Sequence, residues 1–281
     1  MKIPRIIFNF NDICRNGCPF CFMQFDHKGS GSLDLWIRII NRLYEFSPDL
    51  ISFSGCDALY YDDFYQLLQV IPKQSLWALD TSLMFLNRND FAMIYDKIDI
   101  IGTSIDDCEK MKIRQRYYQD RLNIFFNNIN YVKKLFPNII VHTLYSHLNK
   151  SYLKDIADLL VEKDVKSWML YQFWEFDFQK NTSDFKVSEE EFLNAANELS
   201  AYCKNKIKFD YLPSRNRPVG YFFVSSIGNV YTNSYIDEQR RIGCQIELGN
   251  IFDEDIYQKW EEYCSVSEAE RVLSNKIKRE L

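Results

Sequence analysis

Short apolar runs alternate with longer amphipathic stretches along the first 175 residues. The apolar runs, each typical of a buried strand, are residues 6–10, 50–53, 76–79, 98–105, 139–144 and 168–173. Apolar residues recur at helical spacing in residues 32–46, 62–70, 90–95, 122–136 and 151–162. Because no hairpin signal joins the strands, we expect right-handed crossovers in a parallel α/β sheet. Six such units are too few for the usual eight-stranded barrel, so the pattern predicts a curved, partial barrel.

The pattern changes after the sixth apolar run. A helix is expected over residues 188–203, opening with the capping pattern Ser188-Glu-Glu-Glu191, and a short strand over 207–211. Two further runs, 220–224 and 230–232, are separated by turn residues and predict a hairpin. Residues 251–263 predict an amphipathic helix, and the charged tail 276–281 is expected to be loose. We therefore predict a barrel core over residues 1–175 and a small α+β cap over 176–281 that covers its open side.

Composition narrows the class of protein. With 47% hydrophobic and 26% charged residues, the chain is typical of a soluble globular protein. A net charge of −5 argues against an extended nucleic-acid surface, although a small phosphorylated substrate is still allowed. Neither a signal-peptide core nor a long apolar run is present in the sequence, so we expect no membrane segment and a cytoplasmic location. Five scattered cysteines, residues 56, 108, 203, 244 and 264, agree with a reducing compartment.

Three cysteines stand close together just after the first apolar run. Cys14, Cys18 and Cys21 form a Cys-x3-Cys-x2-Cys motif. Three thiolates at this spacing can hold three irons of an iron–sulfur cube, and the fourth iron is then open to a ligand from outside the protein. A structural zinc site would need four protein ligands, for which His27 is the nearest candidate. The other alternative is that these cysteines are small buried apolar residues.

The motif, with Phe20 directly before its last cysteine, resembles the cluster motif of the radical S-adenosylmethionine (radical SAM) superfamily. The resemblance implies a partial barrel of six βα units, one [4Fe-4S] cluster, and SAM bound to the open iron. No Cys-x2-Cys follows Cys21, so a single cluster is expected. Residues 98–106, 168–173 and 219–251 resemble viperin-like proteins and a subgroup of peptide-modifying radical SAM enzymes.

The resemblance also implies residues that hold SAM. Gly55-Cys56-Asp57-Ala58 stands where the family carries Gly-Gly-Glu-Pro, with Asp57 in place of the acid that holds the amino group of SAM. Asp57 could instead belong to an ordinary acidic turn. The other candidates share a place beside the cofactor in the family: Phe20, Phe22, Ser54, Ser82, Ser104, His142, and Arg114 or Arg116 for the SAM carboxylate. His142 is open to a structural role, and either arginine to a role as a solvated charge.

Two further features bear on the substrate. In radical epimerases of this superfamily a cysteine thiol returns a hydrogen atom to the substrate, and Cys244 is our candidate for that role, with a plain core cysteine as the alternative. The aromatic segment 174–178 either faces the substrate or packs between the barrel and the cap.

The resemblance implies a radical SAM enzyme that reductively cleaves SAM to a 5′-deoxyadenosyl radical. This radical would abstract a hydrogen atom from a ribosomally made peptide, giving a cross-link or an epimer, with an electron donor such as flavodoxin. One alternative is a viperin-like enzyme that binds a nucleoside triphosphate through Lys110, Lys112, Arg114 and Arg116. Another is a non-catalytic iron–sulfur or zinc protein that acts as a binding module.

Overall fold

The six expected strands are present and pair in parallel, in chain order. The computed structural model describes residues 1–11, 14, 16, 18–23, 31–108, 121–136, 139–239 and 241–280. The strands are β1 (Arg5–Asn9), β2 (Leu50–Ser54), β3 (Leu76–Thr81), β4 (Ile100–Ser104), β5 (Ile140–Tyr145) and β6 (Ser167–Gln172). The predicted α/β partial barrel of parallel strands is confirmed.

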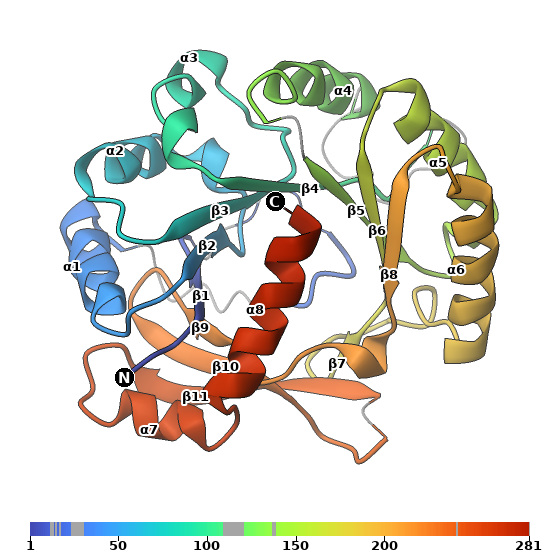
Figure 1. Ribbon diagram of the computed structural model, residues 1–281. Helices are drawn as coiled ribbons and strands as arrows, with labels where there is room; N and C mark the ends of the chain where they lie inside the picture. The colour runs from blue at the N-terminus through green and yellow to red at the C-terminus, as the bar shows by residue number, and fades with distance from the viewer. Residues whose placement is uncertain are drawn as a thin grey trace.

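The helices that follow these strands lie around the outside of the barrel (Figure 1). They are α1 (Leu33–Tyr44), α2 (Asp62–Val70), α3 (Arg88–Phe91), α4 (Arg121–Val132), α5 (Leu153–Glu162) and α6 (Glu189–Cys203), with single 3-10 turns η1 (Ala58–Tyr60), η2 (Tyr95–Lys97) and η3 (Lys150–Tyr152). The capping pattern expected at α6 is confirmed, because the Ser188 hydroxyl accepts from the Glu191 N–H at 3.0 Å. Three glutamates in the first turn of α6 further favour a helix start there.

The strands of the last hundred residues join the same sheet instead of forming a second one. They are β7 (Glu175–Phe176), β8 (Lys208–Leu212), β9 (Phe222–Val224), β10 (Asn229–Tyr235) and β11 (Ile242–Asn250). The described chain forms one sheet of eleven strands in the order β7-β11-β10-β9-β1-β2-β3-β4-β5-β6-β8. The expected hairpin is β9 and β10, and β9 also pairs in parallel with β1. The boundary between a core and a cap at residue 175 remains a prediction.

Two C-terminal expectations were wrong in detail. The helix expected over 251–263 is the shorter α7 (Ile256–Glu261), because β11 runs to Asn250 and the Asp253 carboxylate accepts from the Asn250 N–H at 2.9 Å in the turn that follows. The tail expected to be loose continues the helix α8 (Val266–Glu280). Lysine, arginine and glutamate favour helix, and neither glycine nor proline interrupts residues 266–280.

The two faces of the barrel strands differ in chemistry. Side chains alternate between the faces of a strand. On the outer face, Phe53 packs edge-on against Phe64 of α2 and Trp77 of β3, with ring centroids 5.4 and 5.5 Å apart, in the main apolar core. On the inner face, the first residues of β2 and β4, Leu50 and Ile100, form a separate small cluster with Leu273 of α8. Helix α8 therefore closes the N-terminal end of the barrel.

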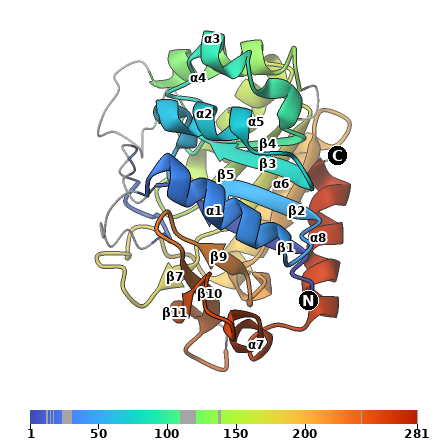
Figure 2. The same cartoon turned by 90° about the vertical axis from the view of Figure 1, so that its left-hand side faces the viewer.

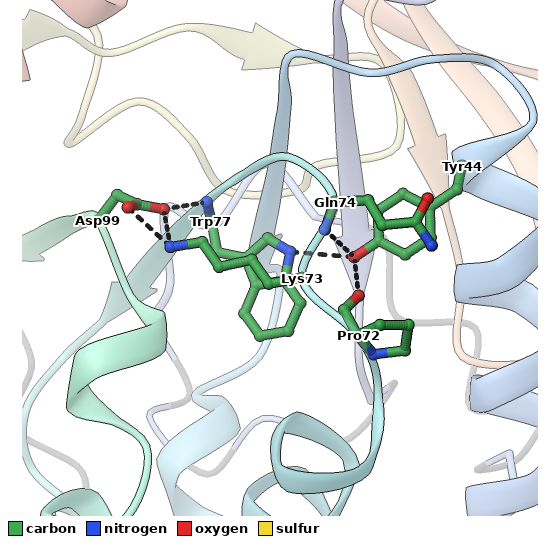
Figure 3. Close-up of polar contacts among 6 residues, drawn as sticks. All are labelled: Tyr44, Pro72, Lys73, Gln74, Trp77 and Asp99. Atoms are coloured by element: carbon green, nitrogen blue, oxygen red, sulfur yellow. Dashed lines mark hydrogen bonds and ion pairs between the residues drawn. The ribbon is translucent and has the colours of Figure 1, made fainter.

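Both chain ends lie at this N-terminal edge (Figure 2). A polar network pins the same edge (Figure 3). The Asp99 carboxylate, just before β4, accepts from the Trp77 N–H at 2.7 Å and pairs with Lys73 Nζ at 2.7 Å. The Tyr44 hydroxyl of α1 donates to Pro72 O at 2.9 Å and accepts from Trp77 Nε1 at 3.3 Å. Helix α8 and this hydrogen-bond network thus occupy the N-terminal edge, so we look for the site at the opposite, C-terminal edge.

No helix in the described ranges is long and apolar enough to cross a membrane.

We expect Leu273→Ala to lower the free energy of unfolding by about 2–5 kcal/mol, because it removes a buried side chain that docks α8 on the barrel. Denaturant titration followed by circular dichroism measures the change. Arg271→Ala is the matched control, since that side chain is 68% exposed on the same helix. It should change stability by no more than about 0.5 kcal/mol. An equal loss in both variants would contradict the role given to Leu273.

Candidate active site at the C-terminal edge of the barrel

The cysteine motif lies on the loop that leaves β1 at the C-terminal edge. Cys14, Cys18 and Cys21 are half-buried and, among the described residues, are in no disulfide; the Cys21 N–H donates to Cys18 O at 3.2 Å in a turn. His27 lies outside the described residues. Within the described ranges, no three His, Cys, Asp or Glu side chains are gathered closely enough to hold a metal ion. The donor set nevertheless fits an iron–sulfur cluster, because three accessible thiols on one short loop are the ligands such a cluster takes.

A glutamine from the far end of the sheet holds this loop by its main chain. Gln179 Nε2 donates to Cys21 O at 2.8 Å and to Phe20 O at 3.3 Å, while its Oε1 accepts from the Phe176 N–H at 2.9 Å. Gln245 of β11 donates in the same way to Phe22 O at 3.3 Å. The sequence carries no signal that distinguishes these two glutamines, and our sequence analysis missed them.

Aromatic rings fix the same loop from the side. Phe20 packs edge-on against Phe185, with centroids 5.7 Å apart, and Phe22 packs against Phe176 at 5.8 Å. Trp174 lies 4.6 Å from Phe176, ring to ring. Of the two alternatives for segment 174–178, packing between the barrel and its C-terminal part is therefore what the structure shows for Trp174 and Phe176.

Gly55 brings the loop after β2 close to β1. Its φ of +94° is a conformation that side chains with a Cβ rarely adopt, and an added Cβ would lie 2.5 Å from Asn9 Oδ1. The next residue, Cys56, is buried, and burial, followed by the neighbouring Cys14 thiol, raises its pKa well above the usual value. Cys56 is therefore a neutral thiol at neutral pH, beside the cysteine loop.

Asp57 joins the loop after β2 to the end of β3. Its buried carboxylate accepts from Thr81 Oγ1 at 2.7 Å, from the Ser82 N–H at 2.9 Å and from the Ser82 hydroxyl. A carboxylate offers about four lone-pair sites, so these three bonds leave room for one more donor. The structure thus brings Asp57 and Ser82 together, and Ser54 lies at the end of the neighbouring strand.

His142 and Ser104 lie across from one another on neighbouring strands. They are partners in the register of β4 and β5, close to the C-terminal end of β4. The imidazole packs edge-on against the Tyr171 ring of β6, with centroids 5.3 Å apart. A Cβ added at Gly102 would lie 2.5 Å from Asp80 Oδ1 and 3.1 Å from His142 Cε1, so Gly102 lets these two polar residues approach each other inside the barrel.

The remaining candidates are two arginines and Cys244. Arg114 and Arg116 lie outside the described residues. Cys244 of β11 is half-buried and pairs across the ladder with Ser234, whereas the next residue, Gln245, reaches the cysteine loop. Since neighbouring residues of a strand point to opposite faces, Cys244 points away from that loop. Burial, followed by the charge of Asp177, raises the pKa of the Cys244 thiol.

Solved structures with the same fold include two enzymes seen with peptides. SuiB from Streptococcus suis bound to its precursor peptide SuiA matches with a TM-score of 0.67 and 12% identity, over 82% of this chain and 59% of that one. The anSMEcpe protein with bound AdoMet and the Cp18Cys peptide matches with a TM-score of 0.71 and 14% identity, over 92% and 80% of the two chains. At these identities the likeness shows the fold.

A third similar structure is HemN, the coproporphyrinogen III oxidase of Escherichia coli, with a TM-score of 0.54 and 11% identity over 93% of this chain and 75% of that one. The chain spans about 60% of the length of SuiB. No curated protein matches its sequence. The sequence profile of the Radical SAM superfamily, however, matches residues 8–160, which is more than half of the chain and includes the cysteine loop. The chain therefore belongs to the radical SAM superfamily of enzymes.

Proposed function

We propose that this chain uses one [4Fe-4S] cluster and SAM to abstract a hydrogen atom from a ribosomally made peptide. The observation that carries the proposal is the loop of three cysteines at the C-terminal edge of a radical SAM barrel, inside the matched range. Cys14, Cys18 and Cys21 would hold the cluster. When bound, the cluster and SAM supply the 5′-deoxyadenosyl radical that takes the hydrogen atom.

The other residues at this edge would position SAM. The remaining lone-pair site of Asp57 suits the amino group of SAM, because a charge-assisted bond to a carboxylate is strong. Gly55, which allows the close approach of Asn9, would set the path of the main chain that leads to Asp57. Ser104 and His142 lie farther around the edge, where the ribose would sit. Arg114 or Arg116 remains our candidate for the SAM carboxylate.

The C-terminal part of the chain would exclude water and guide the substrate. Phe176 and Phe185 cover the cysteine loop, and water exclusion protects a reactive radical from side reactions. We keep residues 1–175 as the proposed core and 176–281 as the proposed guiding region, although the two share one sheet. The role of Cys244 as a hydrogen donor is not supported by its placement and is not part of the proposal.

The peptide substrate rests on the two relatives that are seen with peptides, SuiB and anSMEcpe. A cross-link and an epimer both begin with hydrogen abstraction from a peptide, so the proposal covers both. The basic residues that favoured a nucleoside triphosphate lie at positions 110–116, outside the described residues, so nothing described in the structure favours that substrate. A flavodoxin-like electron donor and a cytoplasmic location complete the proposal.

The first test is the cleavage of SAM by the protein reconstituted without oxygen. We expect 5′-deoxyadenosine on adding SAM and dithionite, measured by chromatography, and none from a variant with alanine at Cys14, Cys18 and Cys21. Cys203→Ala is the matched control, because this thiol is buried in α6 away from the loop and should keep full activity. Equal product from the triple variant, or no product from a fully loaded and reduced wild type given SAM and peptide, would refute the proposal.

Adding peptides encoded beside the gene then tests the substrate. A modified peptide is detected by its mass, and the abstracted hydrogen by the transfer of deuterium from a labelled peptide to 5′-deoxyadenosine.

A second test concerns the glutamine that holds the cysteine loop. Gln179→Ala removes two hydrogen bonds to that loop, and we expect cluster loss to a chelator to become about tenfold faster. Loss is followed by the absorbance of the cluster. Gln69→Ala is the control, since Gln69 lies exposed on α2, and its cluster should be lost at the wild-type rate. Identical rates in the two variants would show that Gln179 does not position the loop.

A further inference from the structure

An arginine enters the barrel from the segment that follows β8. After β8, the chain makes the turn η4 (Ser214–Asn216) and returns toward the sheet at Arg217. The Arg217 N–H donates to Ser214 O at 3.0 Å, and Arg217 O accepts from the Tyr235 hydroxyl at 3.0 Å. The main chain of Arg217 is therefore held between β8 and β10, two strands that lie far apart in the order of the sheet.

The guanidinium of Arg217 lies among tyrosines. Its Cζ is 4.0 Å from the centroid of the Tyr171 ring, and Tyr221 and Tyr235 are its other electrostatic neighbours. The residue is half-buried, but Nε is fully buried. Among the residues that the structure describes, its side chain has no carboxylate partner and Nε has no hydrogen-bond acceptor. Burial lowers the pKa of Arg217. Burying an arginine without a counter-ion costs free energy, and a carboxylate from a ligand would offset that cost.

Arg217 also lies next to the proposed SAM site. The guanidinium covers the Tyr171 ring, and this ring also packs against the His142 imidazole, with centroids 5.3 Å apart. His142 is in turn the register partner of Ser104. Only one aromatic ring therefore separates the guanidinium from the residues proposed to lie beside the ribose.

An unpaired acceptor lies on the same wall. Asn233 is two residues before Tyr235 on β10, so both point to the same face of that strand. Its Oδ1 is buried and has no donor within the described part of the chain. Tyr231, two residues earlier still, accepts a bond from Asn9 of β1, which shows that this face is turned to the barrel interior. Arg217 Nε–H and Asn233 Oδ1 are thus a buried donor and a buried acceptor, each without a bond within the described part of the chain.

We propose that Arg217 binds a carboxylate of the peptide substrate inside the barrel, from an acidic side chain or the C-terminus. This inference rests on the proposed function. The Tyr171 ring covers one face of the guanidinium, so a carboxylate would bond along its edge, where the Nε–H and an Nη–H form a planar fork. The tyrosines beside Arg217 bring no carboxylate, and a second cation, Arg5, lies over the Tyr221 ring with its Cζ 5.4 Å from the centroid, so this wall suits a negatively charged group. Asn233 Oδ1 could then accept from a main-chain N–H of the same peptide.

The test compares two probes of nearly the same shape, the charged N-acetyl-glutamate N-methylamide and the neutral N-acetyl-glutamine N-methylamide. Binding to the reconstituted full chain with SAM, without reductant, is measured by saturation-transfer NMR. We expect the glutamate probe to bind about tenfold tighter or more, since bonds to a charged group are strong. Wild-type protein that does not prefer the glutamate probe would overturn the proposal, and this comparison needs no variant.

Variants then assign the preference to Arg217. Arg217→Gln should abolish it and Arg217→Lys should keep part of it, since lysine retains the charge without the planar fork. Arg215→Gln is the matched control, because Arg215 lies in the same turn but is 58% exposed and paired with Glu189. It should leave the preference intact. A preference that persists in folded Arg217→Gln would overturn the proposal.

Two other outcomes would reassign the residue. Tighter binding of orthophosphate than of the glutamate probe, lost in Arg217→Gln, would indicate a phosphorylated substrate and overturn the carboxylate. A fall in SAM affinity in Arg217→Gln would assign Arg217 to the cofactor and overturn it as well. Because binding is measured without turnover, its result is separate from the proposed function. If Arg217→Gln leaves peptide modification unchanged, only this inference is refuted. If the protein binds the carboxylate probe but modifies no peptide, only the proposed function is refuted.

Discussion

The pairing of β9 with β1 is the contact on which the arrangement of the site depends. Residues 6–8 of β1 bond in parallel to β9 on one side, while β1 pairs with β2 on the other. This one ladder joins the last strands of the chain to the first. It carries β10 and β11 to the side of the cysteine loop, so that Gln245 meets Phe22 although 223 positions separate them in the sequence. Without this ladder, β10, β11 and β7 would not be joined to the barrel strands.

A second constraint is that polar side chains inside the barrel must find partners, because the curved sheet removes them from water. The outer face of the strands is covered by helices and is strongly apolar, whereas the inner face carries Asn9, Asp80, His142 and Arg217 near its C-terminal end. Burying such groups is unfavourable unless each has a partner. Asp57 satisfies this condition within the chain, through Thr81 and Ser82. Arg217 does not satisfy it among the described residues, so the chain itself offsets much of the cost of burying Asp57 but not that of burying Arg217.

The C-terminal part of the chain is therefore a part of the barrel and not only a lid. Gln179 binds the main chain of the cysteine loop, and Tyr235 fixes the main chain of Arg217. At the other end, α8 fills the N-terminal opening with Leu273. Residues far from the cysteine motif thus decide how accurately that motif is held and which part of the interior remains accessible to substrate.

The sequence by itself determined the features that depend on neighbours along the chain. Helical spacing and the Ser188 cap predicted α1 and α6, alternation of apolar runs predicted six parallel strands, and three close cysteines predicted the iron–sulfur loop. Only the tertiary structure decided which strand edges pair, because periodicity gives the buried face of a strand but not its partner. It thereby placed β8 beside β6 and β9 beside β1, turned Cys244 away from the cysteine loop, and brought Gln179 to it. Arg217 likewise reads as an ordinary turn charge in the sequence, and only its contact with Tyr171 shows that it lies inside the barrel.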